Sequence, residues 1–132
     1  MRRMSEYLLD ASALLALLHR EPGEKKVAAI VANATICSVN LAEVVGKLQD
    51  AGIPDEAAQS AIETLGLHVV AFDQAMAFEA GRLRALTRSL GLSLGDRACL
   101  AAGLVLELPV LTADREWLKL KSKLGIVIEA VR

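Results

Sequence analysis

The chain has 132 residues and a net charge of −1, and 54% of its residues are hydrophobic. This length and composition predict one domain over residues 1–132 with a sizeable hydrophobic core, and they exclude a disordered chain. Only 3% of the residues are aromatic, which argues against a row of rings on which single-stranded bases would stack.

The charges are distributed unevenly along the chain. Residues 1–81 hold six Lys or Arg against eleven Asp or Glu, whereas residues 82–132 hold nine against five. This asymmetry suits a protein that carries a polyanion beside a cation-binding cleft, although solvated helix faces would give the same pattern. The longest stretch without a charged residue, 27–42, is too short and too polar to span a membrane. We therefore expect a soluble, cytoplasmic protein with no membrane partner.

Short strands alternate with helices along the chain. Pro22 and Pro54 precede helical patterns, Gly52 and Gly91 end others, and the strands are short apolar runs rich in β-branched residues. In chain order the predicted elements are a strand at 6–9, helices at 12–19 and 23–33, a strand at 34–38, helices at 40–52 and 54–66, a strand at 67–72, helices at 73–91 and 95–108, a strand at 109–113, a helix at 114–120 and a strand at 125–131. The alternation predicts an α/β fold: a three-layer sandwich with a mostly parallel central sheet of four to five strands and helices on both faces.

Acidic residues follow the predicted strands or begin the predicted helices. Ligands of open parallel sheets bind outside the carboxyl ends of the strands. Four segments place an acid where it could face one such cleft: "LLDAS" (Asp10), "SVNLAE" (Glu43), "SLGDRA" (Asp96) and "LTADRE" (Asp114). Four acids brought together repel one another unless a cation binds, and Mg²⁺ and Mn²⁺ prefer oxygen ligands. The pattern therefore favours phosphodiester hydrolysis at a metal site.

Each of these acids also has a purely structural interpretation. Asp10 and Asp114 could cap the helices that follow them. The pairs Asn40 with Glu43 and Ser93 with Asp96 have the spacing of capping boxes. Taken singly, a cap is the simpler interpretation, and only the joint pattern of four acids favours a metal site.

The segments "YLLDASALLALL", "SVNLAEVVGKL", "LSLGDRACLAAG" and "VLTADREW", in this order and at this spacing, closely resemble the PIN-domain ribonucleases, and in particular the VapC toxins of bacterial toxin–antitoxin pairs. The resemblance covers essentially the whole chain. It implies a PIN-like fold and a Mg²⁺- or Mn²⁺-dependent endoribonuclease. It also implies an RNA substrate, a cognate antitoxin protein and a homodimer.

The resemblance assigns the four acids as the catalytic and metal-binding residues. It makes Ser12, Ser38 and Thr112 the hydroxyl partners of these acids. Arg97, which follows Asp96, could hold a substrate phosphate or could simply extend from a helix start. Arg115 lies in a basic stretch and is a second candidate for contact with the RNA backbone.

Two features leave alternatives open. The helix at 54–66 could be pure core, or it could form with the helix before it a groove for the antitoxin helix. The same fold could also serve as a catalytically inactive binding module, or as a PIN nuclease outside toxin–antitoxin systems. A haloacid-dehalogenase-type phosphatase is disfavoured, because Ser12 stands where that family has a second aspartate.

Overall fold

A five-stranded sheet forms the centre of the computed structural model, which describes residues 6–132. All neighbouring strands pair in parallel, in the order β3-β2-β1-β4-β5. The strands are β1 (Tyr7–Leu9), β2 (Ala34–Cys37), β3 (His68–Val70), β4 (Val110–Thr112) and β5 (Ile128–Ala130). The predicted α/β class and the parallel sheet are confirmed.

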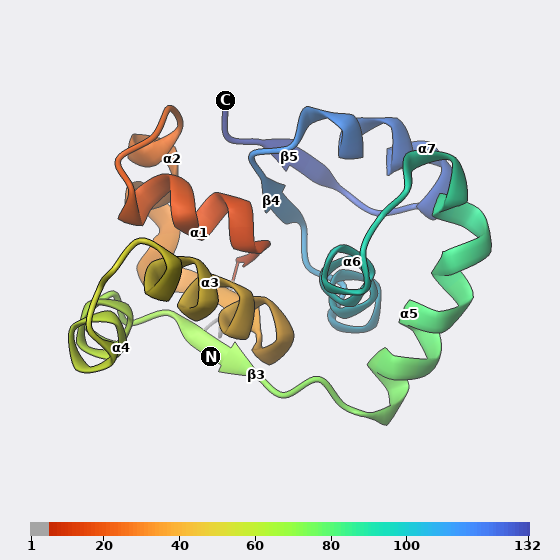
Figure 1. The fold of residues 1–132 in the computed structure, drawn as a ribbon. Helices are drawn as coiled ribbons and strands as arrows, with labels where there is room; N and C mark the ends of the chain where they lie inside the picture. The colour runs from red at the N-terminus through yellow and green to blue at the C-terminus, as the bar shows by residue number, and fades with distance from the viewer. Residues whose placement is uncertain (1–5) are drawn as a thin grey trace, which may run out of the picture.

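Helices cover both faces of the sheet (Figure 1). One layer contains α1 (Ala11–Leu18), α2 (Glu24–Ile30), the short 3-10 helix η1 (Val31–Asn33), α3 (Ser38–Asp50) and α4 (Asp55–Thr64). The other contains α5 (Gln74–Thr87), η2 (Arg88–Leu90), α6 (Leu94–Leu106), η3 (Arg115–Leu120) and α7 (Lys121–Leu124). The predicted three-layer arrangement is therefore present.

Two aliphatic cores lie on opposite sides of the sheet. Successive strand residues point to opposite faces, so Leu8 and Val110 pack under α5 and α6, whereas Leu9 and Leu111 pack under the layer of α1 to α4. Each fully buried side chain of this size contributes about 1.5–3 kcal/mol to folding. Helix α6 is buried over most of its length, as its nearly continuous apolar sequence predicts.

The C-terminal part of the chain differs from the prediction. The segment expected as a helix at 114–120 is the 3-10 helix η3, and it continues directly into α7. Gly125 ends α7 with φ of 66°, a conformation that glycine adopts without steric cost. The strand predicted from residue 125 consequently begins only at Ile128.

Within residues 6–132, no helix is both long and apolar enough to cross a membrane.

Candidate active site

A cleft at the carboxyl edge of the sheet brings the four predicted acids together. Asp10 follows β1 and Asp114 follows β4, and these strands are neighbours at the centre of the sheet. The cleft has a volume of about 220 Å³. Its lining consists of Asp10, Ala11, Ser12, Leu15, Asn40, Glu43, Lys47, Asp96, Asp114 and Trp117. It lies beside β1 and β4, where the strand order reverses, and this is the usual ligand position in such sheets.

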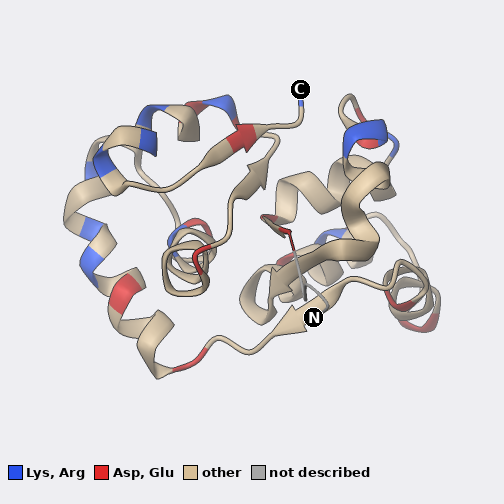
Figure 2. Ribbon diagram, turned by 180° about the vertical axis from the view of Figure 1, so that it is seen from behind, with Lys and Arg blue, Asp and Glu red and all other residues tan. Residues whose placement is uncertain are grey.

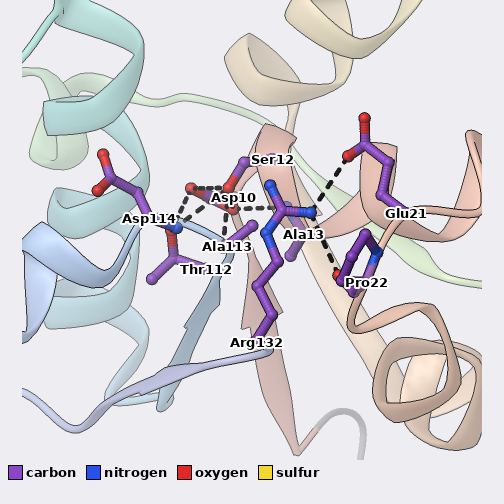
Figure 3. A network of polar contacts seen from close by, with 9 residues as sticks. All are labelled: Asp10, Ser12, Ala13, Glu21, Pro22, Thr112, Ala113, Asp114 and Arg132. Atoms are coloured by element: carbon purple, nitrogen blue, oxygen red, sulfur yellow. Dashed lines mark hydrogen bonds and ion pairs between the residues drawn. The ribbon is translucent and has the colours of Figure 1, made fainter.

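Asp10 lies at the base of this cleft in a dense hydrogen-bond network (Figure 3). Its Oδ1 accepts from the backbone N–H of Ala13 at 2.8 Å and thereby caps α1. Its Oδ2 accepts from Thr112 Oγ1 at 2.7 Å, and Ser12 Oγ donates to the same carboxylate at 2.8 Å from Oδ1. Ser12 Oγ also accepts from the N–H of Ala113 at 2.9 Å. The carboxylate is therefore held by groups from two segments of the chain, the start of α1 and the end of β4.

Burial sets the protonation of Asp10. Only 5% of the residue is exposed. Its pKa is raised from 3.8 to about 6: burial is the main cause and the nearby Asp96 adds to it, whereas the hydrogen bonds from Thr112, Ala13 and Ser12 lower the pKa. Ionising this buried carboxylate is costly, and a cation beside it would stabilise the ionised form.

Glu43 reaches the cleft from α3 and lies against α6. Asn40 Nδ2 donates to Glu43 Oε1 at 2.8 Å and to the carbonyl oxygen of Gly95 at 3.0 Å. A Cβ built at Gly95 would lie 2.5 Å from Glu43 Oε2, so glycine is what allows the carboxylate to rest on this turn. The Oδ1 atom of Asn40 is buried without a hydrogen-bond partner.

Asp96 and Asp114 serve as caps and line the cleft as well. Asp96 forms a capping box with Ser93: its N–H donates to Ser93 Oγ at 3.1 Å, and its Oδ2 accepts from the N–H of Ser93 at 3.0 Å. Asp114 Oδ1 accepts from the N–H of Glu116 at 3.0 Å and caps η3. The structural and functional interpretations of these acids are therefore compatible, because a cap uses only part of a carboxylate's acceptor capacity.

The capping interpretation of Asn40 and Glu43 is wrong. Helix α3 begins at Ser38, so Asn40 lies inside the helix, and its side chain holds Glu43 and Gly95 instead of a free N–H.

The remaining predicted site residues divide into two groups. Ser12 and Thr112 contact Asp10 directly. Ser38 instead accepts from the N–H of Phe72 at 3.0 Å. Arg97 is 8% exposed and donates to the carbonyl oxygen of Ala80 on α5, and Arg115 donates to the carbonyl oxygen of Arg132. Of these five residues, only Ser12 lines the cleft itself.

Asn40 and Lys47 line the cleft and were not among the predicted site residues. Both have a sequence signal. Asn40 precedes Glu43 by three residues and Lys47 follows it by four, and such residues share one face of a helix. Lys47 is exposed and adds a cation to a cleft that otherwise carries four acids.

The donor set of the cleft suits a hard divalent cation. It offers carboxylate oxygens and the unpartnered amide oxygen of Asn40, without histidine or thiol. Among residues 6–132, no three His, Cys, Asp or Glu side chains are close enough to one another to form a ready-made ligand set. Mg²⁺ commonly binds through one or two carboxylates and keeps several waters, so Asp10 with one neighbouring acid would suffice to hold it.

Comparison with known proteins identifies the family. Residues 7–123 match the PIN domain, so the chain belongs to the PIN domain family. A search of curated proteins gave no match.

Among solved structures, the fold is similar to DNA-bound VapBC from Salmonella typhimurium, at 20% identity over 98% of this chain and 100% of that one, with a TM-score of 0.74. It is also similar to DNA-bound VapBC2 from Rickettsia felis, at 17% identity over 94% and 97%, with a TM-score of 0.74. A toxin–antitoxin complex from Klebsiella pneumoniae gives 17% identity over 96% and 98%, with a TM-score of 0.74. At these identities the likeness concerns the fold.

Proposed function

We propose that this protein is a Mg²⁺- or Mn²⁺-dependent endoribonuclease that acts as the toxin of a toxin–antitoxin pair. One observation carries the nuclease part. Four acids from separate segments of the chain, Asp10, Glu43, Asp96 and Asp114, line a single cleft in a PIN-domain protein. The negative charge of the cleft and the raised pKa of Asp10 both favour a bound cation.

The surrounding residues hold two of the acids in fixed orientations. Ser12 and Thr112 fix the orientation of Asp10, and Asn40 fixes that of Glu43. Asp10 and Asp96 would hold the ion, with Glu43 and Asp114 as further ligands, directly or through water. When bound, the ion supplies Lewis-acid stabilisation of the charge on the phosphate and the leaving oxygen. Lys47 is placed to attract the phosphate to the mouth of the cleft.

A cleavage assay tests the nuclease proposal. Structured RNAs are incubated with the protein in Mg²⁺ or Mn²⁺, in EDTA, and with the variants Asp10→Asn and Asp96→Asn. We expect cleavage only by the wild type with a divalent ion. Asp73→Asn is a matched control, because Asp73 caps α5 through the N–H of Met76 at 2.9 Å, as Asp10 caps α1, but lies outside the cleft.

Asp73→Asn should cleave like the wild type. Cleavage that persists in EDTA, or in either cleft variant, would contradict the proposal. A protein that cleaves no RNA under any condition, with or without the acids, would instead support the binding module.

An apolar groove supports an antitoxin as the partner. The groove has a volume of about 430 Å³ and lies between α3, α4 and β3. Its lining consists of Leu41, Val45, Asp55, Gln59, Ile62, Glu63, Leu67 and Val69. Val45 and Val69 are 38% and 41% exposed, so the groove presents apolar surface to solvent. The apolar surface with two acids suits an amphipathic helix that carries basic residues beside its apolar face. One of the similar solved structures, from Klebsiella pneumoniae, is a toxin–antitoxin complex.

Toxicity and its relief test the partner. Expression of the chain alone should arrest bacterial growth, Asp10→Ala should relieve the arrest, and co-expression of a small neighbouring open reading frame should relieve it as well. Val45→Glu should abolish the relief by the partner. Val105→Glu is the control, because Val105 is similarly exposed at 41% but lies on α6, outside the groove.

Equal toxicity of the wild type and Asp10→Ala would contradict the toxin assignment. RNA cleavage without growth arrest would favour a PIN nuclease outside toxin–antitoxin systems. A homodimer stays a prediction of the family resemblance, and light scattering measures it directly.

A further inference from the structure

A second pocket lies between α5 and α6, on a different face of α6 from the acid cleft. It has a volume of about 270 Å³. Its lining consists of Arg84, Thr87, Arg88, Gly91, Leu92 and Arg97. Three of these six residues are arginines and none is acidic, so the pocket is a local concentration of positive charge in a chain with a net charge of −1.

Arg97 is the buried member of this group. Only 8% of the residue is exposed. Its Nη1 donates to the carbonyl oxygen of Ala80 at 3.0 Å, whereas its Nε is buried without a hydrogen-bond partner. A buried guanidinium is costly unless an opposite charge lies beside it. Among the described residues no carboxylate pairs with Arg97, so an anion in this pocket would be stabilised.

The two exposed arginines are also without a counter-ion. Among the described residues, neither Arg84 nor Arg88 forms an ion pair, whereas Arg82 on the same helix is bound to Glu79 at 2.9 Å. Figure 2 shows the basic segments of α5 at successive levels of the helix. Guanidinium groups bind phosphate oxygens in a bidentate manner, so the pocket fits a phosphate group in particular.

The position of the pocket connects it to the acid cleft. Asp96 and Arg97 are consecutive residues in the first turn of α6, and consecutive residues point about 100° apart around a helix with 3.6 residues per turn. Asp96 accordingly lines the acid cleft while Arg97 lines the arginine pocket. The two sites therefore lie on different faces of the same turn of α6.

We propose that the pocket formed by Arg84, Arg88 and Arg97 binds a backbone phosphate of the RNA strand whose scissile bond lies in the acid cleft. This inference rests on the proposed nuclease function. The contact positions the strand across the first turn of α6 without reading its sequence, because a phosphate is the same in every nucleotide.

Binding is measured separately from cleavage. In an Asp10→Asn background, a fluorescein-labelled single-stranded RNA of mixed sequence is titrated at several salt concentrations. The double variant Arg84→Ala/Arg88→Ala should weaken binding about tenfold at low salt. It should also reduce the slope of log K against log salt by about 0.7 for each phosphate that the arginines no longer neutralise. Arg82→Ala is the matched control and should change neither quantity, because Arg82 already neutralises Glu79.

A kinetic readout separates positioning from chemistry. In the wild-type background, Arg84→Ala/Arg88→Ala should raise KM about tenfold and leave kcat nearly unchanged, since these side chains do not line the acid cleft. Titration with inorganic phosphate should shift the Nε–Hε NMR signal of Arg97 in the wild type, and less so in the double variant. This measurement leaves Arg97 intact, because its truncation would disturb the packing of α5 on α6.

The phosphate site would be overturned if the double variant and Arg82→Ala had the same RNA affinity, the same salt dependence of binding and the same KM. This holds even if the wild type cleaves RNA. Loss of RNA binding in the double variant, with no cleavage by the wild type in any divalent ion, would uphold the site and overturn the nuclease.

Discussion

The carboxylate of Glu43 rests on the backbone of Gly95, where a Cβ would lie 2.5 Å from Oε2. We predict that Gly95→Ala displaces the Glu43 side chain and lowers cleavage about a hundredfold, since a misplacement of about 1 Å is enough for such a loss. The free energy of unfolding should change little, because the atoms that must move are the end of a flexible side chain.

The control for Gly95→Ala is Gly81→Ala in α5. A Cβ at Gly81 would have no neighbour within 4 Å, so this variant should gain about 0.5–1 kcal/mol of stability and keep full activity. Activity assays and urea unfolding of both variants check the pair. Equal activity of Gly95→Ala and the wild type would show that cleavage does not require the Glu43 carboxylate to lie against residue 95.

The raised pKa of Asp10 predicts a pH dependence of stability in the metal-free protein. The folded state binds the proton more tightly than the unfolded state, so the stabilisation from this group is complete below pH 3.8 and is lost as the pH rises through about 6. The full loss is about 3 kcal/mol. The wild type should therefore lose stability relative to Asp10→Asn as the pH rises through this range, because the variant has no carboxylate to ionise at this position. A difference that is constant with pH would contradict this prediction.

Divalent ions should stabilise the wild type and do so most at high pH. A cation beside Asp10 favours the ionised carboxylate, so its binding competes with the proton. At a free Mg²⁺ concentration about a hundredfold above Kd, the expected stabilisation is about 2.7 kcal/mol. Thermal unfolding in MgCl₂ and in NaCl of equal ionic strength measures it, with Asp10→Asn and Asp96→Asn expected to show no difference between the two salts. An equal effect of both salts on the wild type would speak against a specific ion.

Asn40 should contribute to the stability of the fold. Asn40→Ala removes the hydrogen bonds that the amide donates to Glu43 and to the carbonyl oxygen of Gly95, so we expect a loss of about 0.5–1.5 kcal/mol in the free energy of unfolding. Gln59→Ala is the control for amide removal, because Gln59 donates to Glu63 on an exposed face of α4, and it should cost less than about 0.5 kcal/mol. Similar losses for the two variants in urea unfolding would mean that the Asn40 contacts contribute little.

The fold is predictable because its signals are local. Strand runs alternate with helical periods from Tyr7 onward, and this alternation alone indicates a parallel sheet covered on both faces. The boundary between η3 and α7 is not visible in the sequence, because 3-10 and α-helical turns have similar side-chain spacing. The late start of β5 has a related cause, since Gly125 both ends a helix and precedes the apolar run that contains the strand.

The acids of the candidate site are predictable for a different reason. Asp10 and Asp114 follow strands, and parallel strands bring their carboxyl ends to one edge of the sheet. Asn40 is harder to recognise, because its spacing to Glu43 is that of a capping box as well as that of one helix face. The side chain of Arg97 points toward α5 because α5 packs against α6, and no local pattern in the sequence predicts this packing.

The cleft lies between two separately packed halves of the protein. Helix α3 contributes to one core and α6 to the other, and the hydrogen bond from Asn40 to Gly95 joins the two helices directly across the end of the sheet. The width of the cleft therefore depends on this bridge and on the Glu43 carboxylate, which rests on the same glycine. Altering the length of that bridge would adjust the opening while the interior on either side stays as it is.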